Sequence, residues 1–227
     1  MKAASCDFDT APTLVATTSP FLKSIVPALP TFFAAYPSID LQLGCSERRA
    51  DLIEEGIDCA VWSGELEDSL IARRIGHLYF GTCASPAYLK AHGQPRHPDE
   101  LAAHSCINHF SPRTGKIFNW TFAKDGTRVQ PALRGHVALD DENSYLAAAE
   151  AGLGIAQIPA FVLKEAIEGN TLELVLGDWF PEPVPLSVVY PQNRHLSSKI
   201  RVFVDWIAEL FSEHDGIQLR STLRSTS

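Results

Sequence analysis

Residues 51–76 read DLIEEGIDCAVWSGELEDSLIARRIG, and this stretch decides the fold class of the chain. Its first part has the charged and apolar spacing of an amphipathic helix, with Leu52 and Ile53 on the buried side and Gly56 as the left-handed stop. The next part, IDCAVW at 57–62, is nearly continuous in apolar residues, as expected of a strand covered on both faces. An acidic loop follows. A helix that leads into a buried strand predicts an α/β protein with a parallel sheet.

The segments before this stretch continue the same order of strand and helix. TLVATT at 13–18 is a β-type run, and Ser19, followed by a proline, predicts an N-cap at the start of a helix. Apolar residues then recur at helical spacing, but Pro27 and Pro30 predict a bent helix or two short ones. Alternating apolar residues at 39–45 predict a second strand. The first half is therefore expected to be doubly wound.

The second half predicts another α/β unit, interrupted by a hairpin. Segment 118–139 reads as a β-hairpin with Asp125 and Gly126 at its turn. The remaining patterns predict helices at 97–104, 142–151, 159–169 and 197–211, and strands at 155–158, 172–176 and 186–190.

The composition predicts a globular protein of the cytoplasm. The chain has 227 residues, of which 45% are hydrophobic, enough for one large or two small cores. Lys and Arg total 19 against 27 Asp and Glu, so the net charge of −8 repels a phosphate backbone. We find neither an apolar run long enough for a membrane span nor the basic-then-apolar pattern of a signal peptide. We therefore expect no membrane association.

The sequence carries no recognisable catalytic or metal-binding motif. Its 5 cysteines are scattered, which is typical of buried thiols in a reducing compartment. His104, Cys106 and His109 come nearest to a metal cluster, but strand alternation puts His109 on the opposite face from the other two. Gly152 and Gly154 lack the third glycine of a dinucleotide fingerprint. We expect no catalytic residue, metal or cofactor, with an enzyme of another chemistry as an alternative.

Four blocks of the chain resemble the effector-binding domain of LysR-type transcriptional regulators. They are residues 51–76, FGTCASPAYLKAHGQP at 80–95, LAAAEAGLGIAQIP at 146–159 and VVYPQNRHLSSKIRVFVDWIAELF at 188–211. Each block alone is weak evidence for the family, but the four blocks together, in matching order and spacing over about residues 13–212, make the resemblance specific. The resemblance implies an α/β fold of two Rossmann-like subdomains joined by a two-segment hinge, as in type II periplasmic binding proteins.

The resemblance also implies a domain division and partners. Subdomain I would comprise residues 13–84 and 187–212, and subdomain II residues 85–186, between an N-terminal tail at 1–12 and a C-terminal tail at 213–227. The N-terminal tail is too short for the winged helix-turn-helix that the family carries in front. We therefore expect DNA contact only through that missing domain, and pairing of the effector domains as a homodimer or higher homo-oligomer.

Hydroxyl-bearing residues follow the first two predicted strands, where α/β proteins bind ligands. Thr17, Thr18 and Ser19 come after the first strand, and Ser46 after the second. By resemblance these positions contact the effector. The alternative is that Ser19 and Ser46 are only helix caps.

Trp62 and Ser63 end the third strand, where many relatives of the family have an arginine. An indole offers a flat apolar face and one N–H donor in place of a bidentate carboxylate clamp. We hypothesise that the effector is less acidic, or carries an apolar part that stacks on Trp62. Packing of Trp62 in the core is an equal alternative.

The second subdomain is expected to supply the opposite wall of the site. Its candidates are His109, Phe110, Asp140, Asp141, Gln157, Pro159 and Phe161. Two adjacent carboxylates would disfavour a dianionic ligand, although an ordinary acidic first turn of a helix also explains them.

The function we expect is a sensor that binds a small-molecule effector and signals to an attached DNA-binding domain. Three alternatives stay open: an extracytoplasmic solute-binding protein of a transporter, an enzyme, and an oligomerisation module without a ligand.

Overall fold

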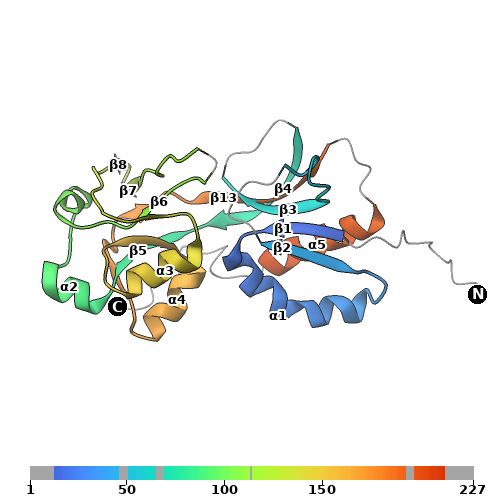
Figure 1. Ribbon diagram of the computed structural model, residues 1–227, viewed down its shortest axis with the longest axis horizontal. Helices are drawn as coiled ribbons and strands as arrows, with labels where there is room; N and C mark the ends of the chain where they lie inside the picture. Colours follow the sequence, from blue (N-terminus) through green and yellow to red (C-terminus); the bar gives the residue numbers. More distant parts are fainter. Residues whose placement is uncertain (1–12, 46–50, 65–68, 113, 193–196, 213–227) are drawn as a thin grey trace, which may run out of the picture.

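The computed structural model describes residues 13–45, 51–64, 69–112, 114–192 and 197–212. Figure 1 shows two groups of elements side by side along the long axis, here called the first lobe, built around β1, and the second lobe, built around β5. Ser46, a predicted site residue, lies outside the described residues.

The first lobe is built on a five-stranded sheet in the order β2-β1-β3-β13-β4. Its strands are β1 (Thr13–Thr17), β2 (Leu41–Cys45), β3 (Cys59–Ser63), β4 (Leu70–Leu78) and β13 (Val184–Pro191). β1 runs parallel to β2 and β3, which confirms the predicted parallel unit, whereas β13 runs antiparallel to β3 and β4. The edge strand β4 was not predicted from the sequence.

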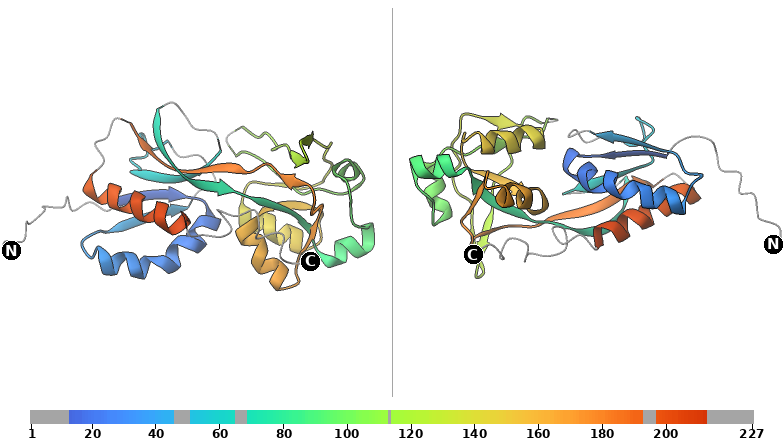
Figure 2. Two further views of the ribbon diagram at one scale, coloured as in Figure 1. Left: turned by 180° about the vertical axis from the view of Figure 1, so that it is seen from behind. Right: turned by 90° about the horizontal axis from the view of Figure 1, so that it is seen from below.

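Helices α1 (Ser19–Ala35) and α5 (Ser198–Ser212) pack on one face of this sheet (Figure 2). Because side chains alternate along a strand, Val61 of β3 joins their core, together with Phe203 of α5. Its neighbour Trp62 points to the other face and packs there with Leu52 and Val189. The fold therefore buries both faces of β3.

One prediction for helix α1 is corrected, and of the two forms predicted for the segment with Pro27 and Pro30, the bent single helix is the one found. Thr18, not Ser19, is the N-cap of α1, and the helix continues through Pro27 and Pro30 instead of dividing. Its buried stripe, which includes Phe32 at 0% exposure, packs on the sheet and offsets the hydrogen bonds that prolines remove. Figure 1 shows the predicted bend.

The described part of the helix predicted to end at Gly56 is instead a set of turns. Asp51 Oδ1 accepts the backbone N–H groups of Ile53 and Glu54, both at 3.0 Å, and such bonds compete with helical ones. Leu52 is buried as predicted, but Ile53 is 53% exposed. Gly56 does take the predicted left-handed conformation, with φ of 69°.

The second lobe has a mixed sheet. Its strands are β5 (Phe80–Ala84), β6 (Asn108–His109), β9 (Ala138–Leu139), β10 (Ala156–Pro159) and β11 (Glu173–Val175). A three-stranded part, β10-β5-β11, and a two-stranded part, β6-β9, are joined by a parallel bridge between Cys106 and Ile155. β6, β9 and β10 thus run in the same direction.

The two faces of this sheet have different covers. α3 (Glu142–Glu150) and α4 (Ala160–Glu168) pack on one face. The other is covered by α2 (Pro86–His92), the 3-10 helix η1 (Pro98–Ala103), β7 (Phe122–Lys124), β8 (Thr127–Val129) and β12 (Phe180–Pro181). Asp125 and Gly126 form the predicted hairpin turn, but the hairpin is shorter than 118–139 because β9 pairs with β6.

The chain passes between the lobes twice, from β4 to β5 and from β12 to β13. The predicted boundaries at residues 84 and 187 stay a prediction. Tyr79, between β4 and β5, accepts the N–H of Ala160 at 2.8 Å, and the rings of Phe21 and Phe161 stack with centroids 5.8 Å apart. The N-terminal end of α4 therefore contacts both the β4–β5 connection and the first lobe. Within the described chain, no helix is both long and apolar enough for a membrane crossing.

Candidate functional site

The carboxyl end of β1 meets the second lobe, and we call this region the lobe junction. Thr17 ends β1, is only 3% exposed, and its Oγ1 has no hydrogen-bond partner in the described part of the protein. Thr18 caps α1 without a side-chain hydrogen bond, and Ser19 is the first helical residue. α1 contacts α3 of the second lobe, and Figure 1 shows the N-terminal end of α1 close to α3.

Trp62 and Ser63 lie at the end of β3, as predicted. Trp62 is only 7% exposed and packs against Leu52, Ile57 and Val189. This burial favours the core-packing alternative over a stacking surface for the effector. Contact of either residue with a ligand stays a prediction.

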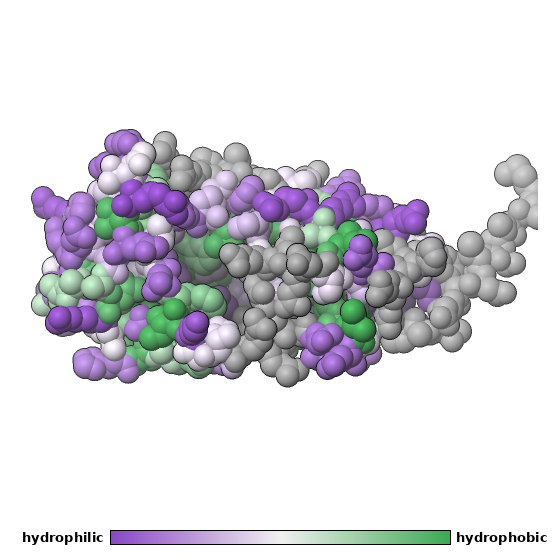
Figure 3. Space-filling model, turned by 90° about the horizontal axis from the view of Figure 1, so that it is seen from above, coloured by the Kyte–Doolittle hydropathy of each residue, from purple (hydrophilic) through white to green (hydrophobic). Residues whose placement is uncertain are grey.

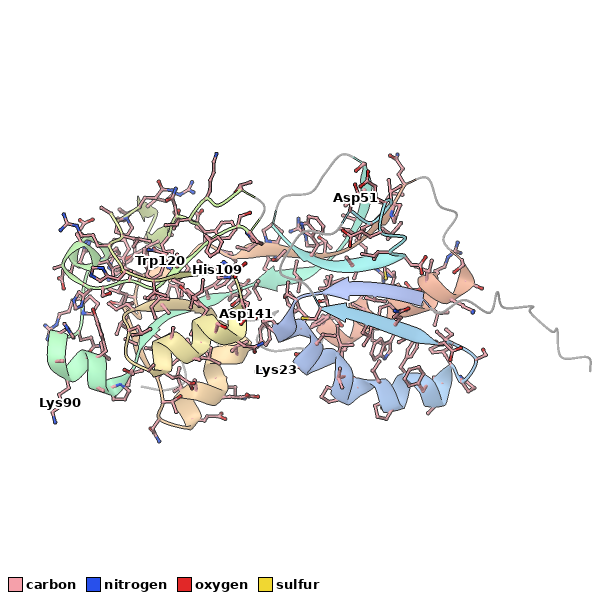
Figure 4. All side chains as sticks on the ribbon, viewed as in Figure 1. Lys23, Asp51, Lys90, His109, Trp120 and Asp141 are labelled. Atoms are coloured by element: carbon pink, nitrogen blue, oxygen red, sulfur yellow. The ribbon has the colours of Figure 1, made fainter. Side chains whose placement is uncertain are left out.

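Three parallel strands of the second lobe end at one edge of its sheet. His109 ends β6, Asp140 directly follows β9, and Pro159 ends β10. Figure 4 shows His109 and Asp141 on the side of this lobe that faces α1, with Trp120 farther into the lobe. Three residues predicted from the sequence, His109, Asp140 and Pro159, thus lie along the same edge of the second-lobe sheet.

His109 is held between aromatic rings. Phe118 stacks on it at a centroid distance of 5.6 Å, and Tyr145 meets it edge-on at 5.4 Å. Burial lowers the pKa of the imidazole below 6.5, against the opposing effect of Asp140 and Asp141. The lowered pKa favours the neutral ring, and the approach of Nε2 to Glu142 Oε1, at 3.8 Å, is an ion pair only when the ring is protonated.

Asp141 is the N-cap of α3. Its Oδ2 accepts the backbone N–H of Ser144 at 2.7 Å, and hydrogen bonds from Ser144 hold the pKa of the carboxyl below its usual value. Asp141 therefore has the structural role that was the alternative to ligand binding, since it caps a helix. Its carboxylate already occupies the N-terminus of α3, where an anion would otherwise bind. Asp140 is partly buried beside it.

The other predicted residues take different roles. The N–H of Gln157 donates to the Tyr145 hydroxyl at 3.2 Å, while its Nε2 is buried without a partner among the described residues. Phe161 packs on the first lobe, and Phe110 donates its N–H to Leu139 at 3.0 Å. Pro159 is buried as the N-cap of α4.

Sequence reasoning missed Thr82 of β5 and Asn108 of β6. Thr82 is 2% exposed and Asn108 7%, yet Thr82 Oγ1 and Asn108 Oδ1 have no hydrogen-bond partner in the described chain. A polar residue inside an apolar run, as in FGTCA at 80–84, was the signal available. Such unpaired buried groups are uncommon and call for an explanation.

The surface near the junction is recessed. Figure 3 shows, from above, hydrophobic surface set below a polar rim close to the middle of the molecule. In the described segments, no three His, Cys, Asp or Glu side chains are grouped so as to hold a metal ion.

Two α/β lobes joined by two crossing segments are the architecture of the regulatory domains of LysR-type regulators. The regulatory domain of CrgA from Neisseria meningitidis superposes with a TM-score of 0.76 at 28% identity, covering 88% of this chain and 98% of that one. AphB, the Vibrio cholerae virulence activator, gives a TM-score of 0.74 at 30% identity, covering 90% of this chain and 70% of that one.

The model of the LysR substrate binding domain matches residues 13–212, and the chain belongs to this family. The HTH-type transcriptional regulator YhjC of Escherichia coli is 34% identical over 200 residues, 84% of this chain and 64% of that protein. The chain thus spans less than two thirds of the curated relatives it matches.

Proposed function

We propose that this chain is the effector-sensing part of a LysR-type transcriptional regulator, and that a small molecule binds at the lobe junction. Buried polar atoms without hydrogen-bond partners among the described residues carry the proposal. They are Thr17 Oγ1 of the first lobe and Thr82 Oγ1, Asn108 Oδ1, His109 Nε2 and Gln157 Nε2 of the second. A ligand that pairs with such atoms recovers the free energy lost when they were buried.

For the whole protein, we propose that effector binding changes DNA binding by the helix-turn-helix part that the relatives' names indicate, in a cytoplasmic homodimer or higher oligomer. The effector must bind one angle between the lobes better than another, because equal affinity shifts no equilibrium. Because the chain's relatives include HTH-type transcriptional regulators, we favour a regulatory role over that of a solute-binding protein.

A thermal-shift screen of metabolites against the chain tests the sensing role. A true effector raises the melting temperature with the logarithm of its concentration. It should be recovered chemically unchanged, as judged by NMR of the released compound. Absence of any stabilising compound would contradict the proposal, and conversion of the compound would favour an enzyme.

A further inference from the structure

Three polar residues stand in a row across neighbouring strands of the second lobe. Thr82 of β5 pairs directly with Gln157 of β10. On the other side of β10, the parallel bridge between Cys106 and Ile155 puts Asn108 of β6 in register with Gln157. The Tyr145 hydroxyl lies between the two strands there, because it donates to the Ile107 carbonyl at 2.9 Å and accepts the Gln157 N–H at 3.2 Å. Residues at matching positions of neighbouring strands share a face, so the three side chains form one row across this part of the sheet.

This polar row lies on the sheet face opposite α3 and α4. The neighbours Ala156 and Cys83, which point the other way, pack in the core with those helices. The two ends of the row are buried, at 2% for Thr82 and 7% for Asn108, whereas Gln157 in the middle is partly exposed. The side-chain nitrogen of Gln157 is itself buried, as are Thr82 Oγ1 and Asn108 Oδ1, so bulk solvent does not satisfy any of these three atoms.

The row offers uncharged hydrogen-bonding groups. Its unpartnered atoms are a hydroxyl, an amide oxygen and an amide nitrogen: Thr82 Oγ1, Asn108 Oδ1 and Gln157 Nε2. Exchanging the oxygen and nitrogen of either amide swaps a donor for an acceptor but adds no charge. These atoms match hydroxyl or amide groups of a ligand, each of which both donates and accepts.

The charges at the adjoining edge of the sheet are negative. Asp140 and Asp141 are the charged groups whose fields act on His109, and Asp141 already fills the N-terminus of α3. A carboxylate or phosphate placed here would be repelled by both and would find that helix end taken.

We propose, on the basis of the proposed function, that the effector is a small uncharged molecule bearing hydroxyl or amide groups, bound with the row Thr82, Gln157 and Asn108 as its floor. Such a site differs from one in which an arginine binds a ligand carboxylate, because its hydrogen-bonding groups carry no charge.

The test is a thermal-shift screen and titration of uncharged, anionic and cationic metabolites against wild type, Thr82→Val and Thr127→Val. Thr127 is an exposed residue of β8 and serves as the matched control. We expect the compounds that bind wild type to be uncharged, and their affinity to fall about 10-fold in Thr82→Val but not in Thr127→Val. Thr82→Val without ligand should melt no lower than wild type, since it loses only an unpaired hydroxyl.

Bound compounds that are anions, held for instance at the N-terminus of α1, would overturn this inference and leave the proposed function standing. Equal affinity of wild type and Thr82→Val for an uncharged ligand would overturn the assignment of the row. If no compound of any charge binds, the proposed function itself fails.

Discussion

Thr17 ends β1 with a buried hydroxyl that has no hydrogen-bond partner within the described residues. The hydroxyl of Thr171, in contrast, has a hydrogen-bond partner, because it donates to Glu150 at 2.7 Å. We predict that Thr17→Val raises the free energy of unfolding by about 1 kcal/mol and that Thr171→Val lowers it by about 1 kcal/mol. Urea denaturation of the unliganded protein measures both. Equal losses in the two variants would show that Thr17 serves packing and not a ligand.

His109 is expected to make stability depend on pH. Its pKa is lowered from 6.5 in the folded state, chiefly by burial, so the unfolded chain binds the proton more readily. Stability is therefore unaffected well above pH 6.5 and falls as pH drops from there through the lower folded pKa. Urea midpoints of wild type and His109→Gln between about pH 5 and 8 should diverge in slope, with the variant flatter. Parallel profiles would contradict this assignment.

At the scale of elements, α3 depends on its cap. Because Asp141 accepts the N–H of Ser144, Asp141→Ala should cost about 1 kcal/mol of unfolding free energy, and Asp141→Asn much less. Asp140→Ala, the matched control, should stay within about 0.5 kcal/mol of wild type. Urea denaturation at neutral pH measures the free energy of unfolding of the three variants and of wild type. A larger loss for Asp140→Ala than for Asp141→Ala would mean that the cap is wrongly assigned.

The strands and helices that periodicity predicted are those with a clear buried face. IDCAVW and the amphipathic α5 are examples, whereas β4 was missed because Arg73 and Arg74 interrupt its apolar pattern on an exposed edge of the sheet. The turns at 51–56 depend on the Asp51 side chain, which propensity alone does not reveal. Pairing across strands also lies beyond periodicity, so Gln157 could be predicted by resemblance while its neighbour Thr82 could not.

At the scale of the whole molecule, Phe161 holds the lobes together. It stacks on Phe21, which is 2% exposed in the core of the first lobe. Phe161→Ala should therefore lower the free energy of unfolding by about 2 kcal/mol, below the range for fully buried rings. Phe118→Ala, a control whose residue is 52% exposed, should lose less than about 1 kcal/mol. The reverse order in urea denaturation would show that the contact between lobes adds little.

Sensing requires that the ligand bind one angle between the lobes better than another. Buried atoms without hydrogen-bond partners among the described residues lie on both lobes, Thr17 Oγ1 on the first and Gln157 Nε2 on the second. Fold and family could be predicted from the sequence, but the proposal for the ligand's chemistry needed the strand register, which pairs Thr82 with Gln157.

Calorimetric titration of the tightest-binding uncharged compound into wild type and Gln157→Ala tests whether the effector binds at Gln157. We expect one molecule bound per chain, with an affinity about 10-fold weaker in the variant because its hydrogen bond with the Gln157 side chain is lost. Identical affinities in the two proteins would contradict it.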